Sequence, residues 1–147
     1  MVCEVNMELY IKCHCMKIFI SGLYNFIQKV LAKEYHVKFE MDNNSIYIGH
    51  KTFYMYIFTD EQTKVNDIMM DEYGIDINNV VIINVYNKMY EEALKDIAEI
   101  INWLMKENTQ DFMLLDEQSV QILYRKKERI LFNDNYVNFP YYLINIS

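Results

Sequence analysis

The chain has 147 residues, of which 52% are hydrophobic, and it carries a formal net charge of −7. This is the length of one ordinary domain, so we expect a single domain over residues 1–147, and the apolar content excludes a disordered chain. The negative charge disfavours binding to nucleic acid or to anionic membranes and favours a basic protein partner.

The N-terminal residues and the number of cysteines indicate the cellular compartment in which the protein is expected. Glu4 and Glu8 stand where a signal peptide would carry positive charge, and no apolar run reaches the roughly 18–20 residues of a membrane helix. We therefore expect a cytoplasmic protein. Three cysteines are an odd number, which favours free thiols over a disulfide framework.

The first expected element is a strand over residues 7–15. Side chains alternate between the two faces of a strand, so Leu9, Ile11 and Cys13 would share one face. His14 would then point away from the cysteines on either side of it. A structural zinc site needs four ligands in spaced pairs, and the chain has no second pair. We expect no metal and no cofactor.

A helix is expected over residues 21–35, with Ser21 as its N-cap and an apolar stripe that includes Val30. Strands are expected over 36–42, 43–50 and 51–59, the first two joined by an Asn-rich hairpin turn.

An acidic, partly helical excursion is expected over residues 60–76. Residues 78–87 are apolar on both faces, which is typical of a central strand. A long amphipathic helix over 87–108, capped by Asn87, follows this strand.

Three short strands are expected within residues 111–134, and the tail 138–147 is apolar enough to add a last strand. Hairpins dominate this order of elements, and two helices interrupt it. The sequence therefore predicts an α+β fold, a largely antiparallel sheet with two main helices packed on it.

Motifs for catalysis are missing from the sequence. It contains no glycine-rich phosphate loop and no Gly-x-Ser-x-Gly elbow, and His14, His36 and His50 have no carboxylate or nucleophile at a telling spacing. A triad formed only in space stays open at this point. The basic cluster at residues 124–130 is more simply a solubilising hairpin tip than a phosphate site. We expect neither an enzyme nor a nucleic-acid-binding protein.

Acidic residues concentrate in two stretches, and such patches speed association with a basic partner. Tyrosines between them would supply interface anchors. The expected partner-binding residues are Asp60, Glu61, Asp67, Asp71, Glu72, Asp76, Asp111, Asp116 and Glu117.

From about Asp71 onward the order of elements resembles the Sit-type immunity proteins of bacterial polymorphic toxin systems, including contact-dependent growth inhibition. The pattern is a strand ending in a polar-Lys pair (Asn87-Lys88), a long helix, an Asp-led apolar strand (111–115), an acidic turn at Glu117 and a closing "ILFN" strand. The chain departs from this family in its turn, Asp116-Glu117 for Asn-Gly-Glu, and in Asn87, where an acid is usual.

This resemblance implies an inhibitor that binds the C-terminal domain of a cognate toxin, which in many systems is a basic nuclease, without catalysis. Two alternatives remain: a host- or phage-protein-binding module, and a small-molecule-binding α+β domain that uses Phe53, Tyr54, Tyr56 and Phe58. Either a monomer or a homodimer is compatible with the sequence.

Overall fold

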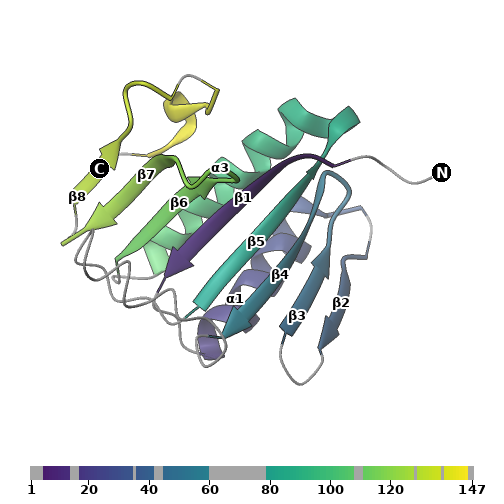
Figure 1. Cartoon of the computed structure of the whole chain (residues 1–147). Helices are drawn as coiled ribbons and strands as arrows, with labels where there is room; N and C mark the ends of the chain where they lie inside the picture. The colour runs from purple at the N-terminus through teal and green to yellow at the C-terminus, as the bar shows by residue number, and fades with distance from the viewer. Residues whose placement is uncertain are drawn as a thin grey trace.

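One sheet organises the chain (Figure 1). The computed structural model describes residues 5–13, 17–34, 36–41, 45–59, 79–107, 111–127, 129–136 and 138–145. Its eight strands lie in the order β2-β3-β4-β5-β1-β6-β7-β8, and every neighbouring pair is antiparallel. The predicted α+β fold, with an antiparallel sheet and two main helices, is confirmed.

The elements follow the predicted order. The strands are β1 (Val5–Cys13), β2 (Lys38–Met41), β3 (Ser45–Gly49), β4 (Phe53–Thr59), β5 (Asn79–Tyr86), β6 (Phe112–Asp116), β7 (Gln121–Lys126) and β8 (Arg129–Phe132). The helices are α1 (Lys17–Phe26), which continues as the π-helical turn η1 (Ile27–Leu31), and α3 (Tyr90–Glu107), which follows the 3-10 turn η3 (Asn87–Met89).

The core lies between the helices and one face of the sheet. Both helices pack on the same side of the sheet, as Figure 1 shows. On that side β1 buries Leu9 and Ile11, and β5, the predicted central strand, buries Ile83 and Val85. The stripe of α3 closes over these residues with Ala93, Leu94, Ile97, Ala98, Ile100, Ile101 and Leu104.

The two helices begin differently from the prediction. α1 starts at Lys17, so Ser21 lies inside the helix and not at its N-cap. The wider π-helical turn then rotates the stripe, which leaves Val30 47% exposed while Ile27 is buried. Asn87 opens η3 and does not cap α3. No helix in the described part of the chain is both long and apolar enough to cross a membrane.

The tail is not the predicted strand. Its described part contains a 3-10 turn, η4 (Tyr141–Leu143), after Pro140, which has no N–H to give to a ladder. Side chains hold it instead. Asn102 of α3 donates to the carbonyl of Leu143 (2.8 Å) and accepts from the N–H of Asn145 (2.8 Å), while the Tyr141 hydroxyl donates to the carbonyl of Ile122 (2.7 Å).

The expectation of free thiols is wrong for Cys13, which is disulfide-bonded. Its buried position on the core face of β1 agrees with the predicted alternation. The other two cysteines, Cys3 and Cys15, lie outside the described residues.

Two neighbouring isoleucines on β5 test which face of the sheet is the core. Ile83 is fully buried, whereas Ile82 faces the other side and is partly exposed. We expect Ile83→Ala to lower the free energy of unfolding by about 2–5 kcal/mol, because it leaves a closed cavity. Ile82→Ala should cost about 1 kcal/mol, since the Ile82 side chain is already partly exposed. Equal losses in urea denaturation would contradict this arrangement.

Candidate functional site

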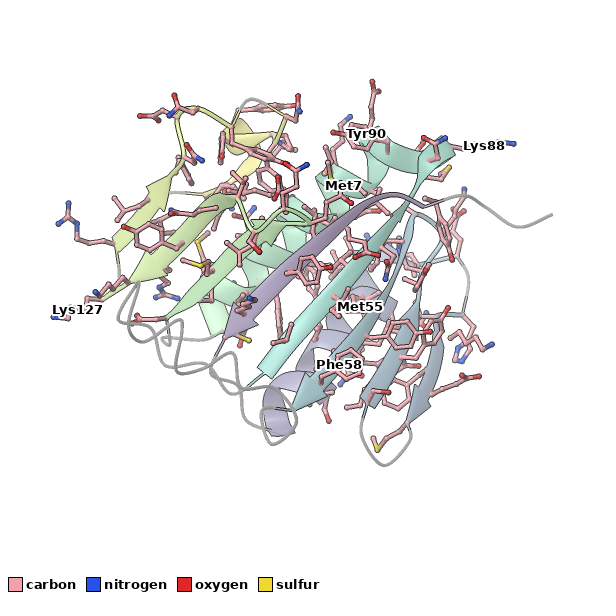
Figure 2. All side chains as sticks on the ribbon, viewed as in Figure 1. Met7, Met55, Phe58, Lys88, Tyr90 and Lys127 are labelled. Atoms are coloured by element: carbon pink, nitrogen blue, oxygen red, sulfur yellow. The ribbon has the colours of Figure 1, made fainter. Side chains whose placement is uncertain are left out.

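Aromatic side chains gather on the side of the sheet that faces away from the helices. Because side chains alternate along each strand, residues two apart on β3, β4 and β5 come to lie on this side. We call this group the aromatic face: Tyr47, Tyr54, Tyr56, Phe58 and Tyr86. The side chains of β3 and β4 can be followed in Figure 2, where Phe58 is labelled.

The five rings form one continuous cluster. Tyr47 lies directly across from Tyr56, with ring centroids 5.2 Å apart, and reaches Tyr54 at 6.0 Å. Tyr54 also contacts Tyr56 (5.9 Å) and Tyr86 (5.6 Å), and Tyr56 contacts Phe58 (6.2 Å). Such offset and edge contacts hold the rings in place, so the cluster is ordered before anything binds.

Gly49 makes room for one of these rings. A Cβ at this position would lie 2.9 Å from the Tyr47 hydroxyl oxygen and 3.1 Å from its Cε1. The glycine therefore lets the Tyr47 ring lie across β3 toward Tyr54.

The aromatic face is partly open to solvent. Tyr56 is 36% exposed, and the other four rings are partly buried against one another. Burial raises the pKa of the Tyr47 and Tyr54 phenols above the ordinary value of 10.0, so both stay neutral near pH 7. Neutral tyrosines with an apolar body and a polar tip are the residues that protein interfaces favour.

Phe53 does not belong with the other aromatic residues of β4. It is fully buried on the core side, where it stacks on His50 with centroids 4.6 Å apart. The four residues proposed for a small-molecule pocket are thus divided between the two faces of the sheet.

The acidic residues expected to contact a partner fall into two groups. Asp60, Glu61, Asp67, Asp71, Glu72 and Asp76 lie in residues 60–78, outside the described residues, so their role stays a prediction. Asp111, Asp116 and Glu117 are described.

These three described acids are not one cluster. Asp111 immediately precedes β6 and Asp116 is its last residue, and both carboxylates accept hydrogen bonds from hairpin turns. Asp111 accepts from the N–H of Lys127 (3.0 Å), and Asp116 accepts from the N–H groups of Gln118 and Val120 (2.9 Å each). Glu117 is exposed in the turn between β6 and β7.

The acidic segment is attached beside the aromatic face. Thr59 and Asn79, which flank residues 60–78, pair directly across β4 and β5, one position from Phe58. The sequence between them has six acidic residues and one lysine, a net charge of −5. The residues that carry most of the net charge of the chain therefore join the sheet at this end of β4 and β5.

A polar cluster lies on the helix side of the sheet. It consists of His50, Thr52 and Asp96, of which Asp96 is far from the other two in the sequence. Thr52 donates its hydroxyl proton to Asp96 (2.7 Å), and His50 Nδ1 lies 3.1 Å from the same hydroxyl oxygen and 3.9 Å from the Asp96 carboxylate. His50 Nε2 lies 3.0 Å from the carbonyl oxygen of Leu31. A hollow of about 460 Å³ borders this cluster.

The hydrogen bonds of this cluster indicate a structural role, in which the three side chains hold separate parts of the chain together. Since a carbonyl only accepts, His50 Nε2 carries the proton, and Nδ1 of the neutral ring accepts from the Thr52 N–H (3.2 Å). The Thr52 hydroxyl points its proton at Asp96, not at the histidine. The cluster joins the end of η1, the β3–β4 turn and α3.

A groove of about 680 Å³ lies between α1, α3 and the β7–β8 hairpin. Trp103 and Phe26 stack along it at 5.6 Å, and Arg125 lines it. Arg125 is only 9% exposed and donates to the carbonyl of Met105 (3.1 Å) near the end of α3. Arg125 is therefore not part of an exposed basic hairpin tip, because its side chain lies on the helix side of the sheet. Lys127 is exposed at the turn (Figure 2).

Within the described residues, no three His, Cys, Asp or Glu side chains are grouped so that they could hold a metal ion. Comparison of the chain with protein families, with curated proteins and with solved structures finds no match. The function must therefore be argued from the residues themselves.

The sequence contained one signal for the aromatic face. In "FYMYIFT", residues 53–59, tyrosines alternate with Met55 and Ile57, which predicts an aromatic side and an aliphatic side. The partners from β3 and β5 required the strand register.

The polar cluster predicts a pH dependence of stability. Burial lowers the pKa of His50 below its ordinary value of 6.5, although the Leu31 carbonyl and Asp96 oppose this shift. The unfolded chain then takes up a proton near pH 6.5 that the folded chain does not, so the free energy of unfolding should fall as the pH drops below 6.5. Asp96, whose pKa burial raises above 3.8, acts in the opposite direction at lower pH.

Urea denaturation at pH 7.5, 6.5 and 5.5 measures this slope. We expect His50→Gln to reduce it, and His36→Gln, at an exposed histidine, to leave it unchanged. A slope that is the same in wild type and His50→Gln would show that His50 is not its source.

Proposed function

We propose that this chain is an immunity-type protein, which binds a cognate bacterial toxin domain through the aromatic face and neutralises it without chemistry of its own. The observation that carries the proposal is the set of five contacting rings on the side of the sheet opposite both helices. Tyrosine is among the residues enriched in the hot spots that dominate the binding energy of protein interfaces. The proposed resemblance to the Sit-type proteins points to the same class.

Charge indicates the kind of toxin. The net charge is −7, and the most acidic stretch joins the sheet one position from Phe58. A basic domain such as a nuclease would be steered toward this end of the aromatic face. Aromatic sheet faces also bind single-stranded nucleic acids, but those faces are positively charged, so we propose a protein partner and neither nucleic acid nor membrane.

One observation favours a different class of function. The groove beside Trp103 has a volume of about 680 Å³, within the usual range for small-molecule sites. A small-molecule-binding domain would use this groove and leave the aromatic face without a role. A host- or phage-protein-binding module would use the aromatic face and differ from the immunity protein only in its partner.

The proposal places the protein in the cytoplasm, where disulfides are rare, whereas Cys13 is disulfide-bonded and fully buried. We expect this burial to protect the bond from soluble reductants, so that Cys13 stays unalkylated in cells whose thiols are trapped rapidly with an alkylating reagent, as mass spectrometry would show. Alkylation of Cys13 under these conditions would show that the bond does not form in the cell.

The proposed function requires a toxin gene beside the gene for this chain, and it is tested by co-expressing the chain with the C-terminal domain which that gene encodes. We expect wild type to restore growth, and Tyr54→Ser with Tyr56→Ser to weaken toxin binding at least about tenfold and lose protection, because two central anchors are removed. Tyr142→Ser is the matched control, since Tyr142 is 81% exposed and lies outside the aromatic face.

Circular dichroism and thermal unfolding would show that both variants are folded. Protection by the double variant equal to that of wild type would exclude the aromatic face. Failure of wild type to suppress any neighbouring toxin would overturn the proposed function.

A further inference from the structure

A hollow at one edge of the aromatic face combines two rings with a carboxylate. It has a volume of about 680 Å³ and is lined by Lys38, Glu40, Met41, Ser45, Tyr47 and Tyr56. The strand register explains the combination, because Glu40 lies across from Tyr47, and Tyr47 lies across from Tyr56. One carboxylate and two aromatic rings therefore follow one another across β2, β3 and β4 on a single face.

The protein already places one of its own cations here. The ammonium of Lys38 lies 3.3 Å from a Glu40 carboxylate oxygen and 5.9 Å from the centroid of the Tyr47 ring. These are the two contacts that a bound basic group would make, an ion pair and a cation–π contact. The Lys38 and Glu40 side chains are 65% and 62% exposed, so water and salt weaken their attraction and an incoming cation can replace Lys38.

We propose that this hollow receives an arginine side chain of the partner protein, and that Lys38 occupies its place in the free protein. The inference rests on the proposed function and specifies its partner: a protein with an exposed arginine at the contact. Arginine fits better than lysine, because its planar guanidinium can stack on a tyrosine ring while it forms two parallel hydrogen bonds to a carboxylate.

The two charged residues have opposite roles. Glu40 attracts the arginine, so neutralising it weakens binding. Lys38 competes for the same carboxylate and ring, so removing it strengthens binding. If surface charge acted only through the net charge of the protein, neutralising Glu40 or Lys38 would have the same effect on binding as neutralising an acid or a lysine elsewhere on the surface.

Gly49 gives the hollow its shape. Because a Cβ there would lie 2.9 Å from the Tyr47 hydroxyl oxygen and 3.3 Å from Lys38 Cβ, Gly49→Ala must move the Tyr47 ring and also crowds the base of the Lys38 side chain. This variant alters the aromatic wall without removing any charged or aromatic group.

The test uses a small probe and the intact chain. N-acetyl-arginine methylamide is titrated into the ¹⁵N-labelled protein, and the amide signals of Tyr47 and Tyr56 are followed by NMR. The citrulline analogue, a neutral group of the same shape, is the control ligand. We expect saturable shifts with the arginine compound that are absent with the citrulline compound and that weaken at high salt.

The variants then separate the contributions. We expect Glu40→Gln to weaken arginine binding about threefold or more and Lys38→Ala to strengthen it about twofold or more, the range that exposed ion pairs allow. Gly49→Ala should also weaken it. Glu91→Gln and Lys29→Ala, at exposed positions of α3 and η1, are the matched controls and should change it little.

The proposal is overturned if the arginine and citrulline compounds behave alike, or if Lys38→Ala weakens binding. The experiment contains no toxin, so its outcome is separate from that of the proposed function. If Tyr54→Ser with Tyr56→Ser abolishes protection while no arginine binding is seen, the arginine site alone is wrong. Arginine binding without toxin suppression would leave the site and remove the immunity function.

Discussion

The register of β5 between β1 and β4 is the constraint on which the rest of this structure depends. Ile83 pairs with Leu9 on one side and with Met55 on the other, and all three are fully buried under the helices. The same pairing places Tyr56 beside Ile82 on the opposite face. A slip of one residue would exchange the two faces, moving tyrosines into the core and aliphatic side chains into water. The burial of the aliphatic side chains therefore fixes the register of the strands, and this register fixes the position of the aromatic rings.

Much of the fold could be predicted from the sequence because strands and long helices carry strong periodic patterns. The alternation of Leu9, Ile11 and Cys13 and the stripe of α3 identified the core-facing residues. The central position of β5 followed from its apolar character on both faces, although its outer face is partly open. The patterns failed where local hydrogen bonding and chain stiffness decide the outcome. Pro140 and the Asn102 amide turn the tail away from a strand, and the π-helical turn moves Val30 out of the stripe.

The candidate site was less predictable, because it depends on contacts between strands that are distant in sequence. Acidity alone drew attention to Asp111 and Asp116, yet their carboxylates are used by the chain's own turns. An Asp side chain at a turn can accept hydrogen bonds from nearby backbone N–H groups, so acidity alone does not identify a free charge. His50, Thr52 and Asp96 also come together only in the folded chain, 44 positions separating the last two. The sequence around each of these residues does not indicate which residues lie next to it in the folded chain.

The pairing of Thr59 with Asn79 has a consequence for how such a protein can change over time. The chain leaves the sheet and returns to it at adjacent positions, so both ends of residues 60–78 are fixed by the β4–β5 ladder. The entropy of closing a connection rises only slowly with its length, by about 0.6 kcal/mol per doubling. A change in the length of this connection therefore need not alter the pairing of β4 with β5. If the proposed function is correct, a change of partner would then require changes in residues 60–78 and none in the aromatic face.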